Sequence, residues 1–246
     1  MQIFITGVSS GVGRELAKFL VASGHTVWGV ARRKQLLEQL NLDLNSDKFF
    51  YSQCDLADPQ AVESVITQMR ENNFFPEAVI LNAGVLKPDT DKNFDIEAAE
   101  QVLKINFDAN LQLIAEFFKF REVPKQFIAV SSIFALRPDV TAVSYAASKA
   151  ALSMAFRSLR LKYAPRIAFK IIYFGPIQTA INPRTVQYKQ NSVFSATAQR
   201  AARKISSVLD SPKQDFYFPF WATLAVRATM FLPDGIFHKF TNPFRR

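Results

Sequence analysis

A tyrosine and a lysine four residues apart are the side chains whose spacing most suggests chemistry. Tyr145 and Lys149 lie in the run Ser-Tyr-Ala-Ala-Ser-Lys-Ala-Ala at residues 144–151. Four residues make about one helical turn, so in a helix the two side chains share a face. A free phenol has a pKa near ~10, and a neighbouring ammonium lowers that pKa by favouring the phenolate. The pair predicts a tyrosine that transfers protons, although a surface tyrosine packed on a lysine stem would have the same spacing.

A glycine-containing loop near the start of the chain is the second candidate. Residues 2–6, Gln-Ile-Phe-Ile-Thr, have a strand pattern, and Gly7, Gly11 and Gly13 follow before a helical pattern begins. Glycines between a strand and a helix allow a pyrophosphate to approach the backbone and rest on the helix N-terminus. We expect a dinucleotide site here; a purely structural glycine turn is the alternative.

The elements that must position these residues alternate between strands and helices. Strands are predicted at 3–5, 26–30, 49–53, 78–81, 127–130, 168–173 and 216–220, and helices at 13–23, 34–40, 96–120, 144–163 and 221–232. Asp58 and Pro59 open one further helix as N-cap and first-turn proline. Apolar strands separated by helices indicate a doubly wound parallel sheet of the Rossmann type in three α/β/α layers. We expect a single domain over residues 1–246.

Composition narrows the classes of function. The chain has 246 residues, a net charge of +9 and one cysteine, so it can form no internal disulfide, and with only two histidines we expect no metal site. Its basic residues are scattered, which argues against nucleic-acid binding. We expect no signal peptide, because the first strand begins at once, and no apolar run reaches the ~20 residues of a membrane span. The predicted location is the cytoplasm.

Several short motifs occur in order between and beyond these two candidates. Asn82-Ala83-Gly84 follows the fourth predicted strand, Asp55 follows the third, and Asn106 lies in the long predicted helix. Ser132 lies thirteen residues before Tyr145, and the run Phe-Gly-Pro-Ile-Gln-Thr occupies residues 174–179. With the Gly-x-x-x-Gly-x-Gly loop, this series resembles the short-chain dehydrogenase/reductase family over nearly the whole chain. Phe174 departs from the proline of many relatives, which should alter the loop and leave the reaction type unchanged.

The resemblance implies a role for each motif. Ser132, Tyr145, Lys149 and Asn106 match the family's catalytic residues: Tyr145 delivers the proton, Ser132 helps to bind the alkoxide, Lys149 tunes Tyr145 and bonds the nicotinamide ribose, and Asn106 holds a water. Ser131 competes with Ser132, and the family's interval to Tyr145 favours Ser132. Ser144 and Ser148 are expected to be helix residues or pocket lining. Besides Tyr145 and Lys149, the expected cofactor-binding residues are Gly7, Ser9, Ser10, Gly11, Val12, Gly13, Arg32, Arg33, Asp55, Leu56, Asn82, Ala83, Gly84, Gly175, Pro176, Ile177 and Thr179.

The residues after the second predicted strand bear on the choice of cofactor. Relatives that use NAD carry an acidic residue there, whereas this chain has Arg32 and Arg33. A guanidinium pairs with a 2′-phosphate that an acid would repel. We predict NADP(H) in preference to NAD(H), with Arg32 contacting the phosphate and Arg33 in support. Two solvated surface arginines are the alternative, and Ser10 stands where many NADP-using relatives have a basic residue.

The substrate side is less defined. The family places its lid at about residues 180–200, where Ile181, Val186, Tyr188, Val193 and Phe194 are candidates to line an apolar pocket, together with Phe134, Leu136 and Val140. Ordinary packing explains each of these residues equally well. A tail at about 221–246 has Trp221, Leu224, Ala225, Ala228, Phe231 and Leu232 near one helical face, with Arg227 on the other. It is interpreted either as an amphipathic segment in peripheral contact with a membrane or as a helix packed on a partner subunit or over the pocket.

Together these features predict an NADP(H)-dependent oxidoreductase that interconverts a ketone or aldehyde and an alcohol by hydride transfer. The expected substrate is a small, apolar carbonyl or alcohol, and the resemblance implies a homodimer or homotetramer. The alternative is a non-catalytic dinucleotide-binding regulator on the same fold, although such proteins usually lose the Tyr or Lys that this chain keeps. A sugar-nucleotide epimerase or dehydratase is a third class, and the length of the chain argues against it.

Overall fold

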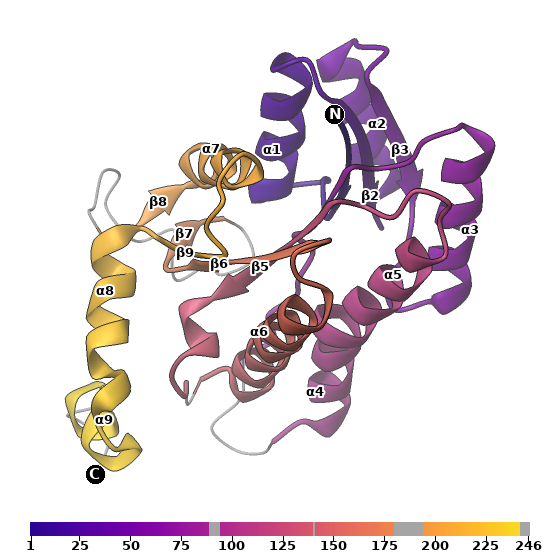
Figure 1. Cartoon of the computed structure of the whole chain (residues 1–246). Helices are drawn as coiled ribbons and strands as arrows, with labels where there is room; N and C mark the ends of the chain where they lie inside the picture. Colours follow the sequence, from indigo (N-terminus) through magenta and orange to yellow (C-terminus); the bar gives the residue numbers. More distant parts are fainter. Residues whose placement is uncertain (89–93, 140, 180–193, 242–246) are drawn as a thin grey trace.

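The central element of the computed structural model is a seven-stranded sheet in which all neighbouring strands are parallel (Figure 1). Residues 1–88, 94–139, 141–179 and 194–241 are described. The strand order is β3-β2-β1-β4-β5-β6-β9. The strands are β1 (Gln2–Thr6), β2 (Thr26–Ala31), β3 (Phe49–Gln53), β4 (Ala78–Leu81), β5 (Gln126–Ser132), β6 (Ala168–Phe174) and β9 (Asp215–Phe218). The predicted doubly wound Rossmann-type sheet in a single domain is confirmed.

Helices cover both faces of the sheet (Figure 1). One face carries α1 (Gly11–Ala22), α2 (Lys34–Leu44) and α7 (Ala198–Leu209), and the other carries α3 (Pro59–Glu71), α5 (Ala109–Phe118) and α6 (Val143–Tyr163). Successive strand residues supply the two apolar layers in turn: Ile3 and Ile5 pack under α1, while Phe4 packs on the opposite side. The central strands β4 and β5 are buried on both faces, so their sequences are largely apolar rather than alternating, whereas the edge strand β3 has exposed residues.

Strand order reverses at β1, which pairs with β2 on one side and with β4 on the other. In an open α/β sheet, ligands bind beyond the carboxyl ends of the strands at such a point. The loop from Gly7 to Gly13 and the turn that begins at Asn82 leave β1 and β4 at this edge. The topology therefore brings two distant motifs together before any side chain is considered.

The boundaries of the helices follow local signals. Asp58 caps α3, because its side chain accepts a hydrogen bond from the Gln60 backbone N–H, as the Asp-Pro pair predicts. Gly24 has a φ of +87° just after α1, in the left-handed conformation that suits a glycine. The predicted helix at 96–120 is instead α4 (Ile96–Leu103), a π-helical turn (Lys104–Asp108) and α5. That turn contains Asn106, and π-helical turns are frequent at functional sites.

The C-terminal part contains the elements least expected from the sequence. Helix α7 was not predicted, although its buried Ala201, Ile205 and Val208 follow helical spacing. A small parallel pair joins β7 (Ile177–Gln178) to β8 (Ala196–Thr197). The tail forms α8 (Phe220–Ala228), a 3₁₀ turn (Thr229–Phe231) and α9 (Asp234–Thr241), and it extends away from the sheet (Figure 1). Within the described residues, no helix combines the length and apolar character needed to cross a membrane.

Candidate active site

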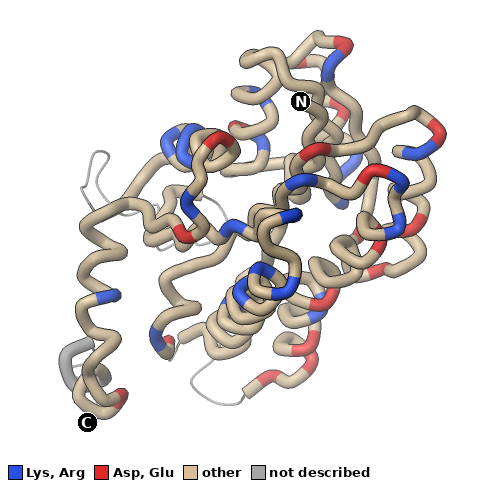
Figure 2. The backbone as a smooth tube through the Cα atoms, viewed as in Figure 1, with Lys and Arg blue, Asp and Glu red and all other residues tan. Residues whose placement is uncertain are grey.

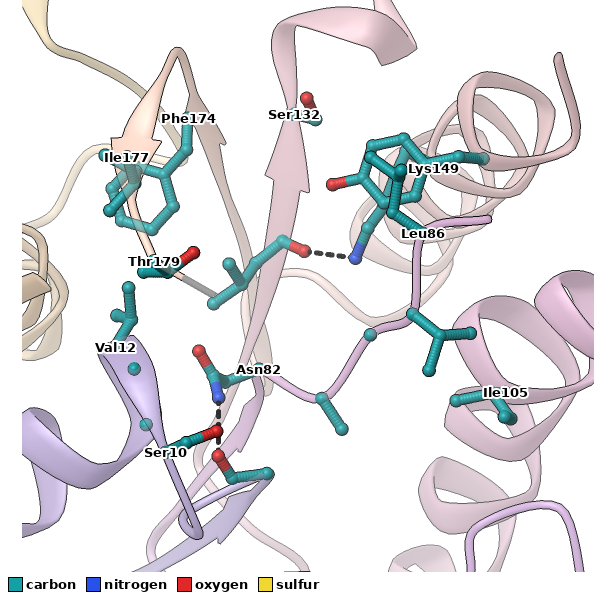
Figure 3. Close-up of a pocket in the computed structure, with 18 of the residues that line it drawn as sticks. Ser10, Val12, Asn82, Leu86, Ile105, Ser132, Lys149, Phe174, Ile177 and Thr179 are labelled. Atoms are coloured by element: carbon teal, nitrogen blue, oxygen red, sulfur yellow. Dashed lines mark hydrogen bonds between the residues drawn. The ribbon is translucent and has the colours of Figure 1, made fainter. Parts of the chain in front are cut away.

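A cavity of about 640 Å³ lies at the carboxyl ends of the central strands (Figure 3). It is lined by the glycine loop, the end of β2, the turns after β3 and β4, the end of β5, the start of α6 and the loop after β6. Every predicted catalytic and cofactor-binding residue lines this cavity except Asn106. The parallel sheet thus gathers motifs that are spread over residues 7–179 into one site.

The glycine loop has a shape that side chains would prevent. Gly7 and Gly11 have φ values of +78° and +57°, and a Cβ on Gly13 would collide with the Gly7 carbonyl oxygen. Asn82 fastens the loop, since its amide Nδ2 donates to the Thr6 carbonyl at 2.9 Å and to the Gly7 carbonyl at 3.4 Å. The result is a backbone cradle at the start of α1, which is where a helix binds phosphate.

Arg33 provides the charge beside this cradle. Its Nη2 donates to Ser9 Oγ at 2.9 Å and to Ser10 Oγ at 2.7 Å. Arg32 lines the same cavity, and its carbonyl accepts a hydrogen bond from Gln53 Nε2. The prediction gave the leading role to Arg32, whereas Arg33 is the guanidinium that reaches the glycine loop. Ser10 thereby gains an arginine partner at the position where many relatives carry their own basic residue.

Ser132, Tyr145 and Lys149 meet at the other end of the cavity. The Ser132 hydroxyl lies near enough to the Tyr145 phenol to lower its pKa, and it accepts a hydrogen bond from the Phe134 N–H at 3.3 Å. Lys149 donates from Nζ to the Val130 carbonyl at 2.9 Å and lies 5.8 Å from the centroid of the Tyr145 ring. Its Nζ also lies close to Gly84, where an added Cβ would approach it to 3.3 Å. Helix α6 therefore presents the tyrosine and the lysine on one face, as their spacing predicts.

Burial shifts the pKa values of both groups. It raises the pKa of Tyr145 to about 12, against a smaller lowering by the Ser132 hydroxyl. It lowers the pKa of Lys149 to about 8, because a charged ammonium is disfavoured away from water. The sequence led us to expect a lowered pKa for Tyr145, and the structure has the opposite shift. Desolvation is the leading cause of the shift in both side chains.

Asn106 lies behind the cavity wall and is fully buried. Its Oδ1 accepts from the Val85 N–H at 2.8 Å, while its Nδ2 donates to the Val85 carbonyl at 2.9 Å and to Ser148 Oγ at 3.0 Å. Asn106 thus ties the turn after β4 to helix α6 directly behind Lys149. These contacts give its side chain a positioning role in the arrangement described.

The competing serines have other partners. Ser131 Oγ is 2.8 Å from Ser153 Oγ, which itself donates to the Lys149 carbonyl, so Ser131 is engaged in packing against α6. Ser148 accepts from Asn106 and donates to the Tyr145 carbonyl. Ser144 is buried in the first turn of α6. Of these hydroxyls, Ser132 is the one that acts on the pKa of Tyr145.

The substrate end of the cavity is mainly apolar. Phe134 lines it, with its ring edge-on to Tyr145 at a centroid distance of 6.1 Å. Leu136 was a candidate, but it packs into the core layer beneath α6 and does not line the cavity. Phe194 is exposed. Four lid candidates (Ile181, Val186, Tyr188 and Val193) and Val140 fall outside the described residues.

Sequence reasoning missed several lining residues next to the motifs. Asp139 and Thr141 add polar groups, with Asp139 Oδ1 accepting from the Thr141 N–H at 2.7 Å and from its hydroxyl at 2.6 Å. Most of the others lie next to motif residues at the carboxyl edge of the sheet. That proximity is the signal that could have identified them. The further lining residues are Val30, Ala31, Cys54, Val85, Leu86, Pro88, Ile105, Val130, Ser131, Ile133, Ala142 and Phe174.

The chemistry of the lining suits a nicotinamide dinucleotide. Backbone N–H groups and Arg33 lie at one end, where phosphates would bind, and a tyrosine, a serine and a lysine lie at the other, where a carbonyl would react. Among the described residues, no three His, Cys, Asp or Glu side chains gather to hold a metal ion. This combination defines the class as a Rossmann-type dinucleotide-binding oxidoreductase.

Comparisons with known proteins identify the family. Residues 1–190 match the model of the short chain dehydrogenase family, so the chain belongs to the short-chain dehydrogenases/reductases, oxidoreductases that act on CH–OH groups. It is 29% identical over 161 residues to a benzil reductase ((S)-benzoin forming) of Saccharomyces cerevisiae, covering 61% of each chain. It is 29% identical to a fatty acyl-CoA reductase of Acinetobacter baylyi, covering 85% of this chain and 73% of that protein.

Solved structures agree with the fold. A short chain dehydrogenase from Burkholderia cenocepacia, determined in complex with NADP, superposes with a TM-score of 0.82 at 19% identity. The superposition covers 100% of this chain and 98% of that one. At this identity the likeness shows the fold alone.

Proposed function

We propose that the protein is an NADP(H)-dependent carbonyl reductase that interconverts a ketone or aldehyde and an alcohol, with Tyr145 as the proton donor. One observation carries the proposal: Tyr145 and Ser132 line the same cavity as the glycine cradle and Arg33. A non-catalytic regulator would not need this tyrosine and serine beside a dinucleotide cradle.

Backbone N–H groups and arginine side chains would hold the cofactor. The glycine loop would bind the pyrophosphate through backbone N–H groups, and Arg33 with Arg32 would pair with the 2′-phosphate. Gly11 lies against Thr179, so the loop after β6 faces the glycine loop across the cavity. When bound, the nicotinamide supplies the hydride. The NADP complex of the Burkholderia structure supports this choice of cofactor.

Proton transfer would be the task of Tyr145. A pKa of about 12 keeps its phenol protonated at neutral pH, so Tyr145 can donate a proton to an alkoxide as the carbonyl is reduced. Ser132 would hydrogen-bond the same oxygen, and donors aimed at developing charge lower the barrier. Lys149, cationic below its pKa of about 8, would stabilise the resulting phenolate. At neutral pH these protonation states match those that carbonyl reduction requires.

The substrate we propose is a carbonyl carried by an apolar group. Leu86, Pro88 and Phe134 line the cavity on the side of Tyr145, while Asp139 and Thr141 provide the polar rim. Two relatives are named for benzil and for fatty acyl-CoA, both of which carry their carbonyl on apolar groups. A carboxylate substrate would meet Asp139, which is unfavourable.

The test is NADPH oxidation measured against a panel of carbonyl compounds that runs from aromatic diketones and long-chain aldehydes to hydroxylated and anionic ones. The proposal predicts turnover of the apolar members, with a higher kcat/KM for NADPH than for NADH. Turnover with NADH alone would overturn the cofactor assignment. Absence of turnover across the panel, in protein that binds NADPH, would favour the non-catalytic alternative.

A further inference from the structure

The C-terminal segment 220–237 presents an unusual number of large apolar side chains to solvent. Six of them are exposed in the described structure: Phe220, Trp221, Leu224, Met230, Phe231 and Ile236. Phe231 is 92% exposed and Trp221 55%. A contiguous exposed set of this kind on a soluble domain marks a site of interaction. We name this set the tail surface.

Three of the six residues of the tail surface lie on the outer side of α8. Phe220, Trp221 and Leu224 fall within about a third of the helix circumference, while Ala222 and Thr223 point to the body and are buried. Arg227 borders the face and stacks on the Tyr217 ring at 4.1 Å. The helix is thus amphipathic, and its apolar side is exposed among the residues that the structure describes.

A separate set of contacts holds the tail in this orientation. Arg137, in the segment after β5, is only 9% exposed and donates from Nη2 to the Leu232 carbonyl at 3.1 Å. Its Nη1 pairs with Asp234 at 3.1 Å, and its guanidinium stacks on the Phe237 ring at 4.3 Å. Arg137 therefore fastens the start of α9 to the segment that lines the substrate end of the cavity. The apolar side chains of α8 are left facing outward.

The net charge of the C-terminal segment indicates which kind of partner the tail surface binds. Residues 220–246 contain four basic residues (Arg227, Lys239, Arg245 and Arg246) and one acidic residue, Asp234. Figure 2 shows that α8 carries little charge, and Arg227 is its one charged residue. A symmetric pair of tails would bring two net-positive segments together, which is unfavourable. A lid over the cavity would bury Trp221 and Phe231, and both are exposed.

We propose that the tail surface docks on an anionic lipid bilayer, as a peripheral contact in which aromatic side chains enter the interface. Tryptophan and phenylalanine with flanking cations are the composition that binds at the headgroup boundary. Anionic lipid complements the net charge of the segment. Docking in this way places the bilayer beside the segment 133–142, so the mouth of the cavity lies close to membrane-dissolved molecules. The proposal does not depend on the reaction that the cavity catalyses.

The test is co-sedimentation of the full chain with vesicles of phosphatidylcholine, prepared with and without phosphatidylglycerol. The protein should pellet with the anionic vesicles and be released by salt. The double variant Trp221→Ser/Phe231→Ser should bind at least about tenfold more weakly, because two apolar side chains no longer enter the interface. The matched control is Leu42→Ser/Leu161→Ser, which removes residues that are 71% and 85% exposed on α2 and α6, and it should bind like the parent chain.

Trp221 supplies a second measurement that needs no substitution. Trp28 is buried in the core, so quenching of fluorescence by brominated lipid should report Trp221. Quenching by anionic vesicles supports the proposal even where the double variant fails to fold. The proposal is overturned by absence of both sedimentation and quenching, or by equal loss in the control variant. It is also overturned where the tail variant changes only the oligomeric state, because the surface is then an interface between copies.

Discussion

Burial changes the pKa values of Lys149 and Tyr145 within one site. The two groups have opposite shifts, with the tyrosine pKa near 12 and the lysine pKa near 8, and desolvation is the leading cause of both. At neutral pH the phenol is protonated and the ammonium is charged. In the proposed reaction, these protonation states suit Tyr145 to donate a proton rather than to accept one.

The pH dependence of carbonyl reduction follows from Lys149. The lysine is cationic below its pKa of about 8 and neutral above it, whereas Tyr145 stays protonated to about 12. We expect kcat/KM for the carbonyl to be level below pH 8 and to fall by up to about tenfold per unit above it. Initial rates across the alkaline range measure this profile. A kcat/KM that stays constant to pH 10 would contradict the role given to the ammonium.

Arg33 is predicted to select the cofactor. Arg33→Ala should raise the KM for NADPH by about 10- to 100-fold, the effect of losing a charged hydrogen-bonding partner, and leave the KM for NADH nearly unchanged. Arg32→Ala is the matched comparison and should have the smaller effect. An equal rise with both cofactors would mean that Arg33 acts only by holding Ser9 and Ser10.

The sequence identified which residues line the site more successfully than it predicted the contacts and pKa values of their side chains. The order of motifs placed Tyr145, Ser132 and the glycines correctly in one cavity. It could not show that Arg33 rather than Arg32 reaches the glycine loop, because the direction of adjacent side chains depends on the local path of the backbone. It also gave the wrong direction for the Tyr145 pKa, since spacing shows the neighbouring charge but not the degree of burial.

At the scale of elements, predictions succeeded where a local signal defined the element. The Asp-Pro pair at the start of α3 and the glycine after α1 are such signals. The π-helical turn at 104–108 has no local signal in the sequence; Asn106 within it pairs with the backbone of Val85, a contact between residues far apart in the chain. Helix α7 was missed although its buried Ala201, Ala202, Ile205, Val208 and Leu209 form an apolar face that packs on α1.

The glycine loop supports a prediction at this scale. Gly13→Ala should abolish dinucleotide binding and destabilise the fold by about 1–3 kcal/mol, since its Cβ would collide with the Gly7 carbonyl and with Asn82. Titration with NADPH and chemical denaturation measure the two effects. Gly235→Ala is the control, because nothing lies within 4 Å of the added methyl group. An alanine at 13 that preserved NADPH affinity would show that the cradle is not the binding site.

At the scale of the molecule, the parallel sheet turns separate sequence motifs into a site. The strands β1, β2, β4, β5 and β6 all end at the same edge of the sheet. The residues that follow these strands therefore lie close together. This convergence was predictable, because apolar strands alternating with helices specify a parallel sheet. The exposure of Trp221 and Phe231 in the tail was not predictable, since exposed apolar residues of an amphipathic helix have the same sequence pattern as buried ones.

Binding of the dinucleotide should stabilise the whole domain. A ligand at a hundred times its Kd adds about 2.7 kcal/mol to the free energy of unfolding, which corresponds to a Tm higher by about 5–10 °C for a domain of this size. NADPH should raise the Tm more than NADH does at equal concentration. Differential scanning fluorimetry measures the two shifts. Equal shifts would contradict the preference assigned to the arginines.

The central claim is that Tyr145 delivers a proton to a carbonyl beside a bound dinucleotide. The most direct test compares the kcat of Tyr145→Phe with that of the parent chain, using the best carbonyl of the panel and NADPH. Tyr163→Phe, on the same helix but outside the cavity, serves as the control. The account predicts that Tyr145→Phe loses at least about 10²-fold in kcat with its NADPH affinity intact, while the control keeps its activity. Full turnover by Tyr145→Phe would contradict it.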